Sequence, residues 1–173
     1  MVDTALDELG KQGKVVANSR IDLARSKIGM VVHAGEPKPD ISSVDAFKRT
    51  LLDAKSIAYS DSASGVYLST VLFERLGIAD QRRSKSRMIP AEPVGAVVAR
   101  GETQLGFQQI SELLPVPGVA LVGPLPEATQ ETTIFAGGVA TGARQAEAAR
   151  ALLQFLSPRP PRRRLSPKVA WSP

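Results

Sequence analysis

Apolar and polar positions follow two alternating periods along the chain. Short apolar runs with the length and composition of buried strands lie at 28–32, 56–59, 87–89, 104–108, 119–122 and 132–139. Between these runs apolar residues recur at helical spacing, as Val44, Phe47 and Leu51 do. Strands that alternate with helices predict an α/β fold with a mainly parallel sheet and flanking helices.

The helix boundaries carry recognisable end signals. Ser42 followed by Asp45 resembles a capping box and predicts that a helix begins there. A helix over 64–76 is expected to end at Gly77, because glycine adopts the left-handed conformation that closes helices. Further helices are predicted over 3–11, from Pro93 to near residue 101, and over 144–155.

Several loops at strand ends are candidate ligand-binding segments, because ligands of open α/β sheets bind beyond the carboxyl ends of the strands. The first loop runs from a strand into a helix and offers Ser62, Ala63, Ser64 and Gly65. Free N–H groups at a helix start and serine hydroxyls favour an anion. Serine and aspartate are also ordinary helix caps, so simple capping is the alternative. The Gly-Lys-Ser/Thr ending of a P-loop is missing.

Two more strand ends carry candidate ligand groups. Pro93 and Val94 open a helix whose N–H groups could reach the same ligand, although proline at a helix start is also ordinary helix design. Gln108 and Gln109 follow a strand. Their amides could bind a carboxylate or an oxyanion, or could form a solvated edge.

The titratable residues give little support for catalysis or metal binding. Asp61 and Glu92 lie in two of these loops, but the sequence does not fix their separation, which general acid–base chemistry requires. The chain has no cysteine and a single histidine, His33, which excludes thiolate sites and His-pair metal motifs. We therefore predict no catalytic residue, no metal and no cofactor.

The net charge of +5 is concentrated at one end. Residues 157–173 hold five basic residues and no acid, so residues 1–156 carry a net charge of zero. A Pro/Arg-rich tail of this kind is typical of disorder rather than of an ordered phosphate-binding surface. We expect no nucleic-acid partner; salt-sensitive DNA binding through the tail is the competing reading.

Several motifs, taken in order, resemble the periplasmic molybdate-binding proteins, which are solute-binding subunits of ABC importers. They are Ser64-Gly65-Val66-Tyr67 at a helix start, Ala91-Glu92-Pro93-Val94, Gly101-Glu102 followed by Leu105-Gly106-Phe107, and the closing helix at 147–156. The resemblance covers about residues 3–157. It implies a type 2 periplasmic-binding fold in which two lobes close on a small anion, in a periplasmic protein that delivers its ligand to membrane subunits of an importer.

The resemblance also assigns roles to residues. Ser64 matches the small residue at the first helix start, and Val94 matches the residue whose N–H binds the ligand. Gln109 falls near the place where molybdate binders have a tyrosine, so the ligand could be another oxyanion or a small carboxylate. Some members of this family resemble isomerases of tricarboxylic acids such as aconitate. The leading expectation is a binding protein without catalysis; an isomerase that uses Asp61 or Glu92 as its base is the alternative.

The resemblance predicts how the chain is organised. Residues 1–25 correspond to a remnant of lobe one, 26–131 to lobe two, 132–156 to the return toward lobe one, and 157–173 to the basic tail. We expect an N-terminally truncated fragment without a signal peptide, since no basic start and apolar run are present. The tail has the composition of a frameshifted ending. Apolar surface exposed by the missing lobe predicts low solubility or dimerisation.

Overall fold

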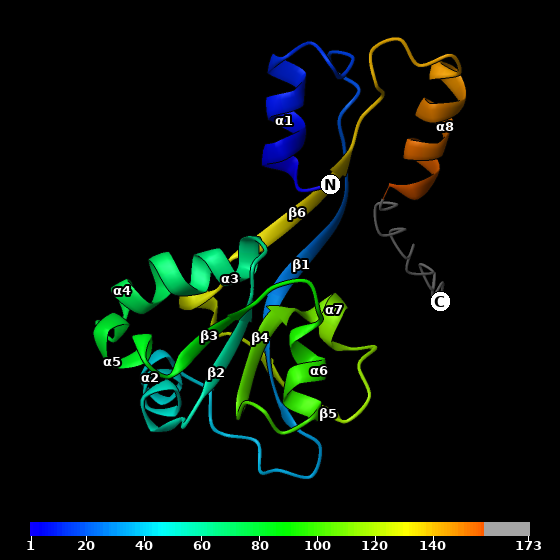
Figure 1. Cartoon of the computed structure of the whole chain (residues 1–173). Helices are drawn as coiled ribbons and strands as arrows, with labels where there is room; N and C mark the ends of the chain where they lie inside the picture. Colours follow the sequence, from blue (N-terminus) through cyan, green and yellow to red (C-terminus); the bar gives the residue numbers. More distant parts are fainter. Residues whose placement is uncertain (158–173) are drawn as a thin grey trace, which may run out of the picture. The chain divides into compact units, whose positions relative to one another are not determined.

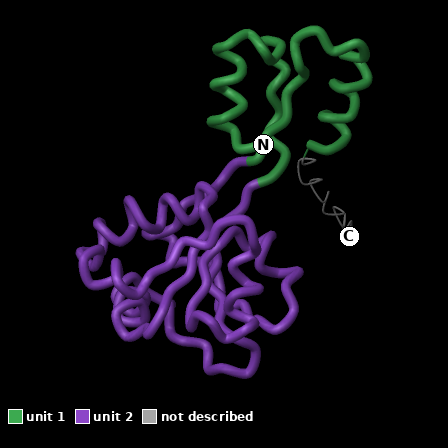
Figure 2. The backbone as a smooth tube through the Cα atoms, viewed as in Figure 1, with its two compact units in different colours: residues 1–24, 135–173 green, residues 25–134 purple. Residues whose placement is uncertain are grey.

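The computed structural model describes residues 1–157, which form two compact units (Figure 2). One unit comprises Arg25–Ile134, and the other comprises Met1–Ala24 with the chain from Phe135 onward. Residues 158–173 of the basic tail lie outside the described residues. The frameshift hypothesis concerns these residues and stays a prediction. None of the helices in the described part has the length and apolar character needed to span a membrane.

The larger unit is built on a mixed sheet (Figure 1). Its strand order is β3-β2-β4-β1-β5, and β6 also pairs with β1. The strands are β1 (Ile21–His33), β2 (Ile57–Ser60), β3 (Ser86–Ile89), β4 (Leu105–Gln109), β5 (Val119–Pro124) and β6 (Thr132–Gly137). The α/β class is confirmed. The sheet is parallel at β3-β2-β4, whereas β1 runs antiparallel to both β4 and β5. Apolar runs predict where strands lie but not their direction, so this reversal could not be predicted from them.

The helices are α1 (Asp3–Lys11), α2 (Val44–Asp53), α3 (Ala63–Tyr67), α4 (Phe73–Arg75), α5 (Ala79–Arg83), α6 (Val94–Ala99), α7 (Ile110–Leu113) and α8 (Ala146–Leu156). The helix predicted over 64–76 is a continuous run in which a π-helical turn, Leu68–Leu72, joins α3 to α4. As expected, Gly77 has a positive φ of 65° and follows the end of this run.

Alternating side chains of β4 face two different layers. Leu105 and Phe107 lie in the main core with Phe47 of α2. Gly106 faces the other way, where an added Cβ would come within 2.6 Å of Val98 of α6. The absence of a side chain at this position therefore lets α6 pack closely on the sheet.

The start of α2 differs by one residue from the predicted capping box. Ser43, rather than Ser42, is the N-cap, and its hydroxyl accepts a hydrogen bond from the Ala46 N–H at 3.1 Å. Two adjacent serines are equivalent in sequence; the extended backbone at Ser43 decides which one caps.

The smaller unit contains α1, the first residues of β1 up to Ala24, the last residues of β6 from Phe135, and α8. Ser19 Oγ accepts a hydrogen bond from the Val139 N–H at 2.9 Å, and Val2 pairs with Phe135 in an isolated bridge. Val15 pairs with Ala140 in a second isolated bridge. Leu6 is buried in α1, whereas none of the eleven residues of α8 is buried.

Candidate functional site

Three serine hydroxyls converge where β2 ends and α3 begins. Ser60 Oγ lies 2.8 Å from Ser62 Oγ and 3.2 Å from Ser64 Oγ, and the last two are 3.4 Å apart. Ser60 and Ser64 are buried. We call these three residues the serine cluster. Ser62 and Ser64 had been selected from the sequence, whereas Ser60 had been treated only as part of the loop.

The serine cluster does not act as a helix cap in this structure. Ser62 occupies the N-cap position of α3, yet its side chain makes no capping hydrogen bond. The hydroxyls instead bond to one another. Each hydroxyl is both a donor and an acceptor, so the group can rotate to present donors to a ligand carboxylate or oxyanion.

Gly65 makes this convergence possible. A Cβ at this position would lie 1.7 Å from the Ser60 carbonyl oxygen and 2.7 Å from the carbonyl carbon. Because both obstacles are backbone atoms, no side chain fits without moving the end of β2. Ala63 lies between the clustered serines in the first turn and is exposed.

The two adjacent glutamines project from β4 to opposite faces of the sheet, as neighbouring residues of a strand do. Gln108 Oε1 accepts a hydrogen bond from the Val94 N–H at 2.9 Å. Pro93, the N-cap of α6, provides no side-chain cap, so Gln108 supplies one from a distant part of the chain. In this structure the Val94 N–H is therefore held by Gln108.

Gln109 contacts a residue that sequence reasoning missed. Its side chain is 3 % exposed, and its Nε2 donates to Thr133 Oγ1 of β6 at 2.7 Å. Its Oε1 has no hydrogen-bond partner within residues 1–157. Ser26 of β1 lies two residues before Ile28, which pairs with Gln109, and its Oγ lies 3.4 Å from Ser111 Oγ. No local sequence pattern links Ser26 to Ser111 or Gln109 to Thr133, because each pair joins residues far apart in the chain.

The two loop carboxylates differ in their surroundings. Glu92 forms a two-point ion pair with Arg100, at 3.0 and 3.2 Å. The hydrogen bonds that Arg100 donates to Glu92 and then to Glu102 raise the pKa of Arg100 above its ordinary value. Asp61 is exposed and takes part in none of the ion pairs found within residues 1–157.

A hollow of about 790 Å³ lies at the opposite end of the strands and contains none of the predicted site residues. Its lining includes His33, the last residue of β1, and also Asp53 and Thr103, which precede β2 and β4. Within the described part of the chain there is no group of three or more potential metal-ligating side chains.

The fold and the position of the serine cluster beyond β2 define a periplasmic-binding-protein type of domain. Residues 1–163 match the family described as bacterial extracellular solute-binding protein, and the chain belongs to this family. The structure is similar to a periplasmic molybdate-binding protein of Azotobacter vinelandii, with a TM-score of 0.65 and 20 % identity over 90 % of this chain and 68 % of that one. It is also similar to the substrate-binding protein of an ABC transporter from Agrobacterium tumefaciens, with a TM-score of 0.61 and 16 % identity over 86 % and 54 % of the two chains. At these identities the likeness shows the fold alone.

A relative from a Pseudomonas species is far more similar in sequence. It is named aconitate isomerase and is 57 % identical over 157 residues, which are 91 % of this chain and 60 % of the relative. The chain therefore spans about 60 % of the length of the curated relative that it matches. Our expectation of a binding protein without catalysis was wrong, because this relative carries the name of an enzyme.

Proposed function

We propose that this chain forms part of an isomerase that acts on a small unsaturated tricarboxylic acid of the aconitate type. The observation that carries the proposal is the 57 % identity to a protein named aconitate isomerase, which extends over nearly the whole chain.

The serine cluster is the proposed binding point for one substrate carboxylate. Its hydroxyls lie within hydrogen-bonding distance of one another and become donors when an anion replaces their mutual bonds. On this proposal exposed Ala63 leaves the backbone open to the ligand, whereas Gly65 admits the Ser60 carbonyl and so holds the cluster together. On this proposal Ser62 and Ser64 have the anion-binding role that the sequence suggests for them.

The end of β4 is the proposed second contact. Thr133 Oγ1 can either accept from Gln109 or donate to it, so rotation of the Gln109 amide by half a turn would keep this bond and expose an N–H donor. After this rotation Gln109 Oε1, which has no partner now, accepts from the Thr133 hydroxyl, and Nε2 is free to donate to a ligand carboxylate. Gln108 and Val94 hold each other, and on this proposal a ligand reaches the Val94 N–H only by replacing Gln108 Oε1.

Moving the double bond of such an acid requires a base that removes a proton from the carbon next to a carboxylate and an acid that returns one at the far end. Of the two loop carboxylates, Asp61 is the better candidate, because Glu92 is held by Arg100 in a two-point ion pair. Asp61 adjoins the serine cluster in sequence and is exposed. We assign the proton transfer to Asp61 as part of the proposal.

The test is an isomerisation assay in deuterium oxide. The chain, alone and co-produced with the part of the Pseudomonas relative outside the match, is incubated with cis- or trans-aconitate and followed by proton NMR. We expect interconversion with deuterium uptake, loss of turnover in Asp61→Asn, and near-normal turnover in Glu92→Gln. The proposed function would be rejected if neither preparation showed interconversion or deuterium uptake. Full activity of Asp61→Asn would reject only the choice of base.

A second candidate is a solute-binding role in an ABC importer. It is supported by the family itself and by the fold shared with importer substrate-binding proteins. On this reading the ligand is a small anion, either an oxyanion such as molybdate or a carboxylate, and the partners are the importer's membrane subunits in the periplasm. Calorimetric titration separates the two candidates: tight molybdate binding without aconitate turnover favours transport.

A further inference from the structure

The C-terminal helix α8 has three distinct faces. Successive residues of a helix are about 100° apart, so residues three and four apart share a face. Ala146, Ala149 and Leu153 are half-buried and form the inner face. An added Cβ at Gly137 of β6 would come within 2.4 Å of Leu153, which shows how closely this face contacts its own unit.

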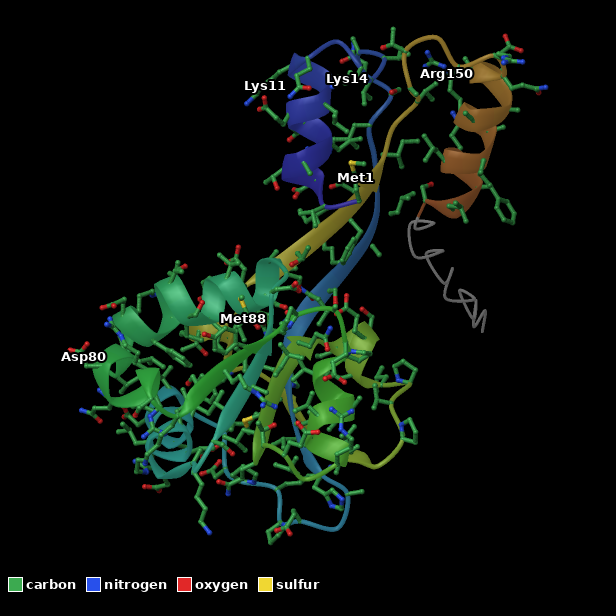
Figure 3. All side chains as sticks on the ribbon, viewed as in Figure 1. Met1, Lys11, Lys14, Asp80, Met88 and Arg150 are labelled. Carbon is green, nitrogen blue, oxygen red and sulfur yellow. The ribbon has the colours of Figure 1, made fainter. Side chains whose placement is uncertain are left out.

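The polar residues of α8 form a separate stripe. Glu147, Arg150 and Gln154 are exposed and lie along one side of the helix, at i, i+3 and i+7. Arg150 is labelled in Figure 3. This polar stripe is the side of α8 that is suited to contact with water.

The third face is apolar and exposed. It consists of Ala148, Leu152, Phe155 and Leu156, at i, i+4, i+7 and i+8. Leu152 is 56 % exposed, Phe155 is 73 % exposed and Leu156 is 51 % exposed. In water, a helix with a polar stripe and a packed inner face gains no stability from a second apolar face. Contiguous exposed apolar residues of this kind mark interaction surfaces.

We propose that this third face is the docking surface for a further polypeptide, namely one that corresponds to the part of the solute-binding fold outside the matched region. The matched residues make up 60 % of the Pseudomonas relative, so the remaining 40 % of that protein has no counterpart in the alignment. The solved structures show the same excess, since the chain covers only 68 % and 54 % of two of them. The occupant is an α/β polypeptide with an apolar face that packs against Leu152, Phe155 and Leu156, whether it is joined to this chain or separate. This proposal is independent of the proposed isomerase activity.

The test uses the full chain and the uncovered part of the Pseudomonas relative, co-expressed with a tag on one of them. We expect a one-to-one complex by size-exclusion chromatography with light scattering. Phe155→Glu should weaken the complex at least tenfold. Gln154→Glu, the adjacent exposed position on the polar stripe, introduces the same charge and should leave the complex unchanged.

Other results would overturn the proposal. A homodimer of the chain alone that Phe155→Glu dissociates would assign this face to a second copy. A complex that forms equally well with Phe155→Glu and with Leu152→Glu would place the contact elsewhere. Absence of any complex, with both partners folded by circular dichroism, would also reject it. Because Phe155 is largely exposed, circular dichroism of the variant chain alone should match that of the wild type.

Discussion

Gly65 shows how a single residue sets the geometry of the serine cluster. The sequence singles it out because glycine lets a ligand approach the backbone closely. In the structure it is the Ser60 carbonyl, rather than a ligand, that lies close to Gly65 and occupies the space that a Cβ would need. The type of residue was therefore predictable, but the neighbour that requires it was not.

Replacing Gly65 with alanine should destabilise the protein by about 1–3 kcal/mol, because backbone atoms at the end of β2 must move to make room. Ligand binding at the serine cluster should fall with it. The matched control is Gly10→Ala in α1, where an added Cβ meets nothing within 4 Å. That change should be neutral or stabilise by about 0.5–1 kcal/mol. Urea unfolding of both variants measures the difference; equal stabilities would refute the steric argument.

Gln108 and Gln109 illustrate the limit of sequence reasoning at the same scale. In sequence they form a pair of equivalent amides at a strand end. In the structure one caps α6 and the other bonds to β6, because adjacent residues of a strand face opposite sides of the sheet. The alternation was foreseeable, but the partners on each side depend on which helix and which strand lie there.

At the scale of elements, a buried arginine that no sequence pattern singles out joins α5 to α2. Arg82 is 3 % exposed, and its Nη1 donates to the carbonyl oxygens of Leu51 at 2.6 Å and Ala54 at 3.0 Å. These acceptors belong to the C-terminal end of α2, where carbonyls lack partners within the helix. Arg82 thus caps α2 from another element, and α2 has no basic residue in its own last turn.

Arg82→Met should cost about 2–3 kcal/mol of stability, because it removes charge-assisted hydrogen bonds to two carbonyls. The neighbouring Arg83 has a side chain that is 82 % exposed, so Arg83→Met should change stability by less than about 0.5 kcal/mol. Thermal unfolding followed by circular dichroism compares them. If the two variants melt together, Arg82 does not cap α2.

At the scale of the whole molecule, the two units differ in how much of their surface is buried. The larger unit holds the main core, whereas α8 of the smaller unit buries none of its residues. Local opening requires little free energy where few apolar contacts are lost. Three of the exposed large apolar residues, Leu152, Phe155 and Leu156, lie together on the third face of α8.

Hydrogen exchange followed by mass spectrometry should detect this difference. Amides of α8, with eleven residues, should exchange at least about tenfold faster than those of α2, a helix of ten residues of which three are buried. The polypeptide proposed to dock on α8 should slow exchange there and leave α2 unchanged. Equal protection of the two helices in the chain alone would contradict this view of the smaller unit.

The sequence by itself determined the alternation of strands and helices, the main helix boundaries and the loop that contains Ser62, Ser64 and Gly65. These features follow from local periodicity, end signals and residue chemistry, which neighbouring residues carry. The tertiary structure alone decided the reversed direction of β1, the cap that Arg82 provides and the partners of Gln108 and Gln109. The contacts concerned join residues 14 to 31 positions apart, and strand pairs further apart still. Only packing of the sheet and helices brings such residues together, so no local pattern records them.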